Sequence, residues 1–413
     1  MDIDRWQQVS FDSVVNINPT RQLQRGKESA YVAMEDLKPF TRTISNYGYR
    51  QFTGSGSRFS NNDILLARIT PCLENGKTAF VDFLEDGEVA HGSTEFIVLT
   101  GKAGVTDSLF IYYLTRSNEF RDFAIAMMEG TSGRQRVPTN ALKRYEFFLP
   151  PFQEQKAIAR ILSSLDDKIQ LNQQMNRTLE AQARAIFKSW FVDFDPVRAK
   201  MEGRQPAGMD AATAELFPDS FEDSPLGMIP KGWNVKTIGD ICEFAYGKAL
   251  KAEDRQPGDV PVYGSNGQIG WHNQVLVKDF GIVVGRKGNP GVVTWVSKDF
   301  YPIDTTFYVI PKSEIRSLHY LFHALSNIDL ASLGADSAVP GLNRNLAYMT
   351  KILVSDYALQ KAFHELISIL SKQVDVNIEQ SRTLSVIRDT LLPKLMSGEI
   401  RVREAEKIVG EAA

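Results

Sequence analysis

The 413-residue sequence has little of several features that would place it in a familiar class. It holds two cysteines, Cys72 and Cys242, whose spacing gives neither a disulfide framework nor a zinc site. No apolar run approaches the ~20 residues that a membrane-spanning helix needs. The first six residues lack the basic and then apolar layout of a secretory signal. We therefore expect a cytoplasmic protein with no disulfide, no bound metal and no membrane contact.

Motifs for catalysis and for cofactor binding are also missing. Residues 149–152 (Leu-Pro-Pro-Phe) lack the polar first residue of the Asn/Asp-Pro-Pro-aromatic tetrapeptide expected of an adenine methyltransferase. The glycine-rich stretch 285–291 lacks the Gly-Lys-Ser/Thr ending of a phosphate loop, and His319 and His323 lack the intervening glutamate of a zinc protease motif. These segments are interpreted as a helix start, a turn and packing histidines, so no catalytic residue and no bound cofactor are expected.

The charge balance is neutral evidence about nucleic acid. The net charge is −3, with 43% hydrophobic and 23% charged residues, which describes an ordinary globular protein. However, several acidic residues are concentrated in the stretch 203–230, and a partner responds to the field of one face rather than to the total charge. Local basic surfaces are therefore compatible with this composition.

What the sequence does contain is a long internal repeat. Gln-Lys-Ala at 155–157 recurs at 360–362, and Arg-Thr-Leu at 177–179 recurs at 382–384, in both cases 205 residues later. Earlier in each copy, three further segments resemble one another: Trp6 and Trp233, residues 64–68 and 282–286, and residues 94–98 and 305–309. The period is far too long for a solenoid and indicates two copies of a unit made of a globular domain and a helix.

The two copies predict an α+β fold in which two similar strand-rich domains are separated by two long antiparallel coiled-coil helices about a pseudo-two-fold axis. Short β-branched and aromatic runs between Gly, Asn and Pro clusters predict the strands, and a helical stretch is expected near 109–123 and near 318–330. The predicted segments are domains at 1–151 and 231–354, helix regions at 152–200 and 355–402, an acidic connector at 201–230 and a C-terminal tail at 403–413.

Heptad spacing of apolar residues in the two helix regions predicts the coiled coil. Asn172 and Asn377 occupy the centre of their series, where a buried asparagine commonly fixes the register of a seam at some cost in stability. The companion series of the second helix becomes polar toward its end, at Arg388. About 34 helical residues span ~50 Å, or ~15 base pairs of duplex, so the helices are interpreted as a ruler. The alternative is that they only stabilise the fold.

Three clusters of arginine, lysine, amide and hydroxyl side chains lie in glycine-containing loops and are predicted to contact DNA. The candidates in the first domain are Arg68, Thr70, Lys77, Arg134, Arg136 and Lys143. The candidates in the second domain are Tyr263, Ser265, Asn266, Arg286, Lys287, Asn289, Arg344 and Lys351. Arginine forks can engage guanine and amides can engage adenine in the major groove, while lysines hold phosphate. The alternative is that these loops are solvated turns.

Several stretches resemble the specificity subunits of type I restriction-modification systems. They are 149–155 leading into 165–169, then 190–196, 225–233, 262–267 and 391–400. The resemblance implies a non-catalytic subunit whose two target-recognition domains read the halves of a bipartite, asymmetric sequence in double-stranded DNA. Two modification subunits carrying S-adenosylmethionine and the adenine methyltransferase site would dock around the helices. Restriction subunits using ATP and magnesium would cleave unmodified DNA.

Two other functions remain open at this point. One is a self-sufficient enzyme that modifies or cleaves DNA, and the other is a coiled-coil scaffold for protein partners. One position also departs from exact repetition, because Glu154 of the first copy becomes Leu359 in the second. Which bases are read does not follow from the sequence, since recognition depends on loop shape and on DNA deformability.

Overall fold

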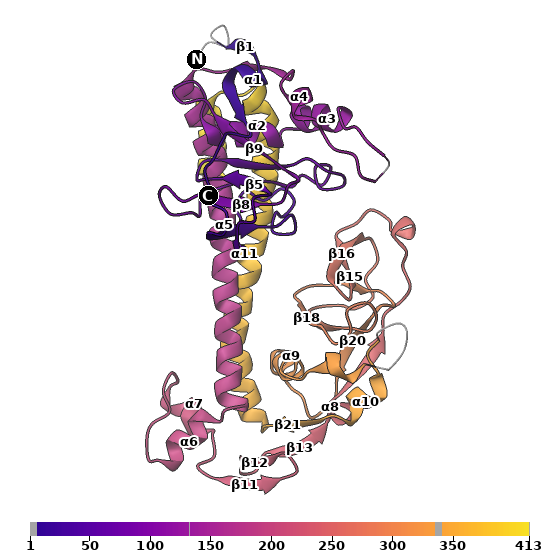
Figure 1. The fold of residues 1–413 in the computed structure, drawn as a ribbon. Coiled ribbons are helices and arrows are strands. Elements are labelled where there is room, and N and C mark those ends of the chain that lie inside the picture. Colours follow the sequence, from indigo (N-terminus) through magenta and orange to yellow (C-terminus); the bar gives the residue numbers. More distant parts are fainter. Residues whose placement is uncertain (1–5, 132, 335–340, 413) are drawn as a thin grey trace. The chain divides into compact units, whose positions relative to one another are not determined.

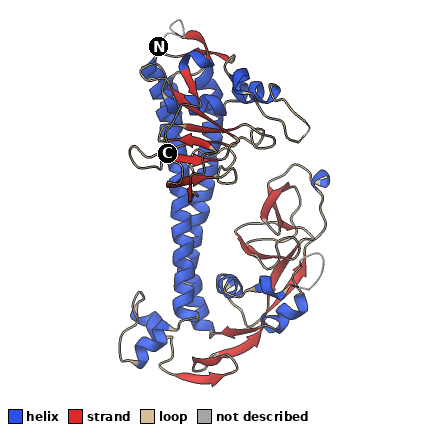
Figure 2. Ribbon diagram, in the orientation of Figure 1, coloured by secondary structure: helices blue, strands red, loops and turns tan. Residues whose placement is uncertain are grey.

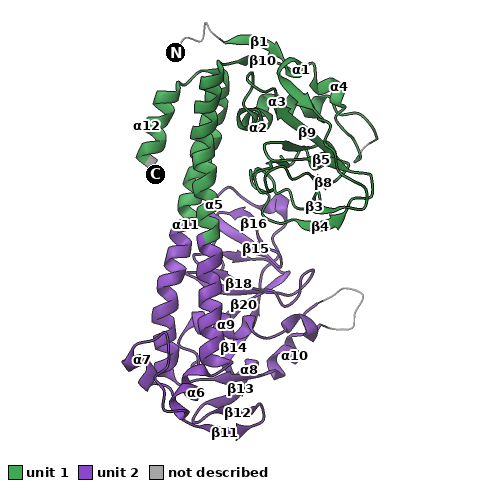
Figure 3. Cartoon of the chain, turned by 60° about the vertical axis from the view of Figure 1, so that its left-hand side comes forward, with its two compact units in different colours: residues 1–174, 378–413 green, residues 175–377 purple. Residues whose placement is uncertain are grey.

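The computed structural model describes residues 6–131, 133–334 and 341–412, and the chain divides into two compact units (Figure 3). Unit 1 comprises residues 1–174 and 378–413, and unit 2 comprises residues 175–377. Residues 1–5, Ser132 of the predicted arginine-rich loop, residues 335–340 and residue 413 lie outside the described residues. Each unit contains a strand-rich part and a portion of each of the long helices α5 (Phe152–Phe191) and α11 (Tyr357–Ser397), as the two colours of Figure 3 show. Figure 1 labels these helices, and Figure 2 distinguishes helices from strands by colour.

Unit 1 has two four-stranded sheets, ordered β2-β9-β6-β7 and β4-β3-β8-β5, and a two-stranded sheet β1-β10. The strands are β1 (Gln7–Ser10), β2 (Val15–Ile17), β3 (Glu28–Val32), β4 (Gly48–Gln51), β5 (Ser57–Phe59), β6 (Ile64–Ala67), β7 (Thr78–Phe80), β8 (Ala90–Gly92), β9 (Phe96–Gly101) and β10 (Glu146–Leu149). The shorter helices are α1 (Phe11–Val14), α2 (Ser108–Arg116), α3 (Asn118–Ala126), α4 (Thr139–Leu142) and α12 (Val402–Ala412).

Unit 2 has a similar topology, with sheets ordered β14-β20-β17-β18 and β16-β15-β19 and the pair β13-β21. Its second sheet has three strands where that of unit 1 has four, and unit 2 adds the hairpin β11-β12. The strands are β11 (Phe221–Ser224), β12 (Gly227–Pro230), β13 (Asn234–Thr237), β14 (Cys242–Tyr246), β15 (Val260–Gly264), β16 (Gly267–His272), β17 (Gly281–Gly285), β18 (Val293–Val296), β19 (Tyr301–Pro302), β20 (Thr306–Pro311) and β21 (Lys351–Val354). The shorter helices are α6 (Asp195–Met201), α7 (Ala211–Glu215), α8 (Ile238–Ile241), η2 (Ala252–Asp254), α9 (Leu318–Ser326), η3 (Leu330–Leu333) and α10 (Arg344–Met349).

The repeated sequence runs form equivalent strands in the two cores. Strand β6 is buried along its whole length and pairs antiparallel with β9, and its counterpart β17 is likewise buried and pairs with β20. A strand covered on both faces needs apolar side chains at successive positions, which is why these runs do not alternate. The predicted α+β fold with two strand-rich domains is confirmed, and helices α2 and α9 lie where helical stretches were expected.

A buried glutamine at the start of each long helix attaches the helix to its own domain. In unit 1 the Gln155 side chain accepts from the Asp107 backbone N–H at 2.9 Å and donates to the Val105 and Pro150 carbonyls. In unit 2 the Gln360 side chain accepts from the Arg316 backbone N–H at 3.1 Å and donates to two carbonyls in the same way. The recurrence of the Gln-Lys-Ala motif therefore has a structural reason, because the same clamp is built twice.

The two long helices pack antiparallel in each unit, since later positions of α5 meet earlier positions of α11. In unit 1, Asp166 bonds to Arg388 and Asn172 bonds to Ser381. In unit 2, the Asn176 side chain donates to the carbonyl of Val374, and the Phe187 ring packs on that of Phe363. Arg388, which the heptad pattern suggested was a polar end of the seam, is instead 6% exposed and ion-paired. Both predicted seam asparagines, Asn172 and Asn377, are buried, and their facing one another remains a prediction.

Two segments that the sequence analysis treated as a tail and a connector contain regular structure. The predicted tail is mostly helix α12, whose Val402 and Ala405 join the core of unit 1. The predicted connector contains α7 and the β11-β12 hairpin, and Phe217 packs edge-on against Trp190 with ring centroids 5.2 Å apart. Across the residues with a described position, no helix has the length and apolar character needed to cross a membrane.

Candidate nucleic-acid interface

In unit 1 two of the predicted DNA-contacting loops lie side by side at the end of the central strand β6. The Val137 N–H donates to the carbonyl of Arg68 at 2.9 Å, and the Thr70 N–H donates to that of Gln135 at 3.0 Å. These bonds hold the segment that follows β6 against the segment 133–137. Arg68 and Thr70 of the first predicted cluster are thereby brought next to Arg136 of the second.

The guanidinium of Arg136 is already occupied by a carboxylate. Its Nε donates to both oxygens of Glu95, at 3.0 and 2.9 Å, and its Nη2 donates to Oε1 at 2.6 Å. This hydrogen bonding lowers the pKa of Glu95, so the carboxylate stays charged beside the arginine. The Glu95 carboxylate holds the Arg136 guanidinium in one orientation and largely neutralises its charge. The sequence could not indicate this pairing, because Glu95 lies 41 residues from Arg136.

The other candidates of unit 1 differ in what they can offer to DNA. Arg134 is exposed in the same loop. The ammonium of Lys77 donates to the Met34 carbonyl at 2.9 Å and so fastens the loop after β3. Lys143 lies at a separate groove, which it lines together with Asp12 and Lys102. The structure therefore groups Arg134 with Arg68, Thr70 and Arg136, but does not add Lys143 to that group.

In unit 2 the corresponding loops also converge. The Leu342 N–H donates to the carbonyl of Arg286 at 2.9 Å, matching the bond between Val137 and Arg68 in unit 1. The Ser265 hydroxyl donates to the Lys287 carbonyl at 2.5 Å, which adds the β15-β16 turn to the group. Three of the candidate side chains are exposed on these loops, namely Asn266, Lys287 and Asn289. No carboxylate among the described residues forms a hydrogen bond or an ion pair with them.

Two arginines of unit 2 contact the same aromatic ring, which was not among the residues predicted from the sequence. The guanidinium carbon of Arg286 lies 4.8 Å from the Tyr246 ring centroid, and that of Arg344 lies 4.7 Å from the same centroid. Each arginine also donates one hydrogen bond to a backbone carbonyl, of Asp304 and of Phe244 respectively. Cation–π contacts of this kind hold guanidinium planes in fixed orientations. No carboxylate among the described residues pairs with either arginine, so both charges remain available.

Tyr246 could have been found only weakly from sequence, as an aromatic residue just before Gly247 and Lys248 at the end of a strand-like run. Tyr246 is 47% exposed although both arginines lie near its ring, so part of the ring is open to a ligand. Exposed aromatic rings flanked by arginine suit stacking against bases as well as contact with phosphate.

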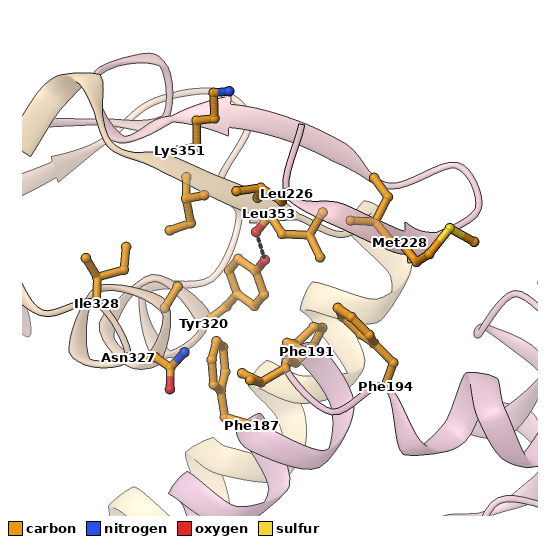
Figure 4. A pocket seen from close by; sticks show the side chains of 14 residues that line it. Phe187, Phe191, Phe194, Leu226, Met228, Tyr320, Asn327, Ile328, Lys351 and Leu353 are labelled. Carbon is orange, nitrogen blue, oxygen red and sulfur yellow. Dashed lines mark hydrogen bonds between the residues drawn. The ribbon is translucent and has the colours of Figure 1, made fainter. Parts of the chain in front are cut away.

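Lys351 and Tyr263 lie apart from this surface. Lys351 borders a cavity of about 290 Å³ lined by aromatic and aliphatic side chains, with its amine pointing away from the rings (Figure 4). Within the cavity wall the Tyr320 hydroxyl donates to the Leu353 carbonyl at 2.9 Å. Tyr263 is largely enclosed, and its ring packs edge-on against Phe300. Tyr263 is therefore part of the packing of unit 2, whereas Lys351 is exposed away from the grouped loops.

The glycines of the stretch 285–291 are needed for packing of the loop on its own chain. A Cβ added at Gly285 would lie 2.1 Å from the Asn289 carbonyl oxygen, and one at Gly291 would lie 2.4 Å from the Ala331 nitrogen. Gly285 is thus needed where the loop folds back on itself, and Gly291 where the loop packs against η3. In the described part of the chain, no three His, Cys, Asp or Glu side chains are grouped as a metal would require.

Comparison with known proteins agrees with the arrangement of two loop-bearing units. A family model described as the type I restriction modification DNA specificity domain matches residues 3–181 and 230–345. The type I restriction enzyme HindI specificity subunit of Haemophilus influenzae is 30% identical over 408 residues, covering 82% of this chain and 86% of that protein. The MjaIX specificity subunit of Methanocaldococcus jannaschii is 26% identical over 334 residues, covering 73% and 71%.

A solved structure has the same fold. The crystal structure of the type I restriction-modification system S subunit from M. genitalium aligns with a TM-score of 0.53 at 21% sequence identity, covering 95% of this chain and 96% of that one. The two strand-rich domains and the packed long helices are therefore an arrangement found in a crystal as well as in this chain.

Proposed function

The chain belongs to the family of type I restriction-modification specificity subunits and is its non-catalytic DNA-recognition component, and from this premise we propose that it reads a bipartite, asymmetric DNA target. Each unit would read one half of the target, and the bases between the halves would remain unread. Family membership replaces the earlier alternatives of a self-sufficient DNA-modifying or DNA-cleaving enzyme and of a scaffold without DNA.

The observation that carries this proposal is the duplicated loop surface. Both units end their central strand in a loop that begins with an arginine, Arg68 or Arg286, and both fasten that loop with the same backbone hydrogen bond. The side chains around the two arginines differ, with Glu95 and Arg136 in unit 1 and with Tyr246 and Arg344 in unit 2. Equivalent frames with different side chains suit an asymmetric target, because each half would be read by its own set of groups.

Partners and cofactors follow from the family and are part of the proposal. Two modification subunits would bind S-adenosylmethionine and methylate adenine, and restriction subunits would use ATP and magnesium to cleave DNA that lacks the modification. No cofactor is proposed for this chain itself. The cytoplasm is the expected compartment, since DNA and these cofactors are found there.

The proposal is tested by selecting random duplexes with the chain in complex with its modification subunits. The wild-type chain should enrich one sequence in two parts. The double variant Arg286→Ala, Arg344→Ala should lose information in one part only, with about tenfold weaker discrimination at each base that an arginine fork reads. Arg204→Ala is the matched control, since Arg204 is an exposed arginine paired with Glu202 in the connector. Enrichment of a single uninterrupted sequence, or loss of both parts in the double variant, would reject the proposal.

The seam asparagines are proposed to fix the register of the helix pair. Asn172 donates to the Gln380 and Ser381 side chains at 2.9 and 3.3 Å, and Asn377 donates to Asn176 at 2.8 Å. Leucine at both positions should raise the melting temperature, because buried amides stabilise a seam less than apolar groups do, but should also increase protease cutting as the register loosens. If melting and proteolysis both stayed at wild-type values, the asparagines would have no such role.

A further inference from the structure

A buried cluster of charged side chains joins the first strand-rich domain to both long helices in unit 1. Asp166 of α5 lies at its centre, with one oxygen accepting from Arg388 of α11 at 2.5 Å and the other accepting from the Tyr113 hydroxyl of α2 at 2.7 Å. Arg116 of α2 lies 3.6 Å from the same carboxylate. The side chains of Arg116, Asp166 and Arg388 are 3%, 6% and 7% exposed, so this ionic contact is shielded from water.

The edge of the cluster continues into the same domain. Arg388 also donates to Asp389, which lies 3.9 Å from Arg116. One residue beyond Asp166, the carboxylate of Asp167 accepts from Arg42 at 2.5 Å. Arg42 is itself buried and lies in the loop that follows β3. The charged side chains of α5 and α11 therefore contact the domain at two places, which are α2 and the loop that follows β3.

The cluster is the second polar attachment of the domain to α5. The first is at the start of the helix, where Gln155 forms its clamp and Glu154 accepts from the Trp6 indole. Asp166 is eleven residues further along, which is about 16 Å of helix at ~1.5 Å per residue. Apolar side chains of both helices also pack in the core of unit 1, but polar bonds at two points along a rod restrict the position and the tilt of the domain more narrowly than bonds at one point. Hydrogen-bonded ions are also more directional than apolar contacts.

The second copy keeps the clamp but lacks the chemistry of the cluster. At the 205-residue offset, Asp166 corresponds to Ser371, and Arg388 corresponds to Ala183. In the helix equivalent to α2, the final residue is Ser326 where unit 1 has Arg116. None of these three side chains can form an ion pair. Their region in unit 2 is instead packed with rings, including Phe187 against His323 with centroids 5.6 Å apart.

We propose that the Asp166–Arg388–Arg116 cluster is a positioning device that holds the first recognition domain at one setting on the helix pair and thereby sets the distance between the two half-sites. The inference rests on the proposed function, since it assigns residues to the spacing of a two-part target. A buried ion pair stabilises a fold little, or less than apolar residues of the same volume. What it supplies is one fixed geometry, and a recognition domain that must meet its bases at a set distance requires that geometry.

The test separates geometry from stability by two variants. Asp166→Asn removes the central charge with almost no change of shape. A second variant replaces the whole cluster by apolar groups, with Asp166→Leu, Arg388→Met, Arg116→Met, Tyr112→Phe and Tyr113→Phe. Tyr112 is included because its buried hydroxyl accepts from Arg116. The second variant leaves no unpaired buried charge and should melt near the wild-type temperature. Ser371→Asn, which puts the same side chain at the equivalent position of unit 2, is the matched control.

Each chain is assembled with its modification subunits and given a duplex library with constant half-sites and a spacer that is one base pair shorter, unchanged or one base pair longer. Methylation at the shifted spacers, relative to the unchanged one, should rise about tenfold in both cluster variants, which corresponds to a loss of ~1.4 kcal/mol of discrimination. It should stay at the wild-type value in the Ser371→Asn control. The half-sites themselves should be read as before.

An apolar variant that melts like the wild type and keeps the wild-type spacer preference would overturn the inference, whatever the behaviour of Asp166→Asn. If Asp166→Asn does not fold, the apolar variant decides alone. A wild-type complex that methylates no two-part sequence would instead overturn the proposed function, and this inference with it.

Discussion

Replacing Glu95 by glutamine should leave the positive charge of Arg136, which Glu95 now neutralises, free to interact with DNA. In the structure the Arg136 guanidinium makes three contacts of 2.6 to 3.0 Å with the Glu95 carboxylate, and the two side chains are 43% and 24% exposed. Glutamine has nearly the same size and keeps one acceptor oxygen, but it removes the negative charge. Arg136 then remains at the loop surface beside Arg68 with its charge free to meet a phosphate.

The expected size of the effect follows from counterion release. Each phosphate that a protein neutralises adds about 0.9 to the slope of log affinity against log salt for duplex DNA. One additional contact by Arg136 should therefore steepen the slope by about 0.9, which gives a further three- to fourfold gain in affinity between 200 and 50 mM salt. The stability of unit 1 should change little, since a partly exposed ion pair contributes little to folding.

The assay is fluorescence anisotropy with a labelled duplex of arbitrary sequence, titrated with the chain in its complex at several salt concentrations. Glu202→Gln is the matched control, because it removes a carboxylate paired with Arg204 in the connector and changes the net charge by the same amount. The Glu95→Gln slope should exceed both the wild-type and the control slope. A slope equal to that of the control, or lower than that of the wild type, would refute the placement of Arg136 at a DNA-facing surface.

Three further predictions concern stability and spacing. Trp6→Phe should lower the free energy of unfolding by about 1–2 kcal/mol more than Trp233→Phe does, as measured by urea melts. The reason is that the Trp6 indole donates to buried Glu154 at 3.3 Å, whereas the Trp233 indole nitrogen has no partner among the described residues. Equal losses in the two variants would contradict this. Burial lowers the pKa of His319 and of His323 to about 4. Because the same side chains have a pKa of ~6.5 in the unfolded state, the unfolded chain binds more protons than the folded one between these two values. Unit 2 should therefore lose stability as the pH falls from ~6.5 to ~4, by at most roughly 3 kcal/mol per histidine. Urea midpoints at pH 7 and pH 5 check this, and a variant with phenylalanine at both positions that showed the same pH dependence would exclude these histidines as the cause. One heptad inserted into both long helices should lengthen the preferred spacer by about three base pairs, as ~10 Å of helix corresponds to ~3 steps of duplex, and an unchanged spacer in selected duplexes would disprove the ruler.

The sequence predicted the fold well where a pattern extends over many residues. The 205-residue repeat and the heptads gave the two long helices and their packing, and the paired runs 64–68 and 282–286 became the equivalent strands β6 and β17. Such patterns are set by burial, and burial leaves a periodic trace in one sequence. The helix α12 was missed because eleven residues after the last heptad looked like an ordinary charged end.

The candidate surface was harder to predict, because it depends on contacts between residues that are far apart in the chain. Nothing near Arg136 in the sequence indicates that Glu95 neutralises it, and nothing near Arg286 indicates that it shares the Tyr246 ring with Arg344. Lys77 was selected for its charge, but its ammonium is directed to the backbone at Met34. Loop composition therefore selected side chains several of which lie together, whereas the pairing of each charge depends on residues that are distant in the sequence.

The structure also explains the difference between Glu154 of the first copy and Leu359 of the second, which the sequence alone did not explain. The acid in the first copy accepts a hydrogen bond from Trp6, whereas the indole of the equivalent Trp233 in the second copy has no acceptor among the described residues. The two copies thus keep the same frame and the same glutamine clamp while their docking contacts have diverged.

The most direct test of the account is to sequence methylated adenines in the DNA of a host that carries this chain with its modification subunit. The account predicts one asymmetric motif in two parts with an unread spacer of constant length, and it predicts that Arg286→Ala with Arg344→Ala alters one part and leaves the other intact. A continuous motif, or the same alteration of both parts, would contradict the claim that each unit reads its own half of the target.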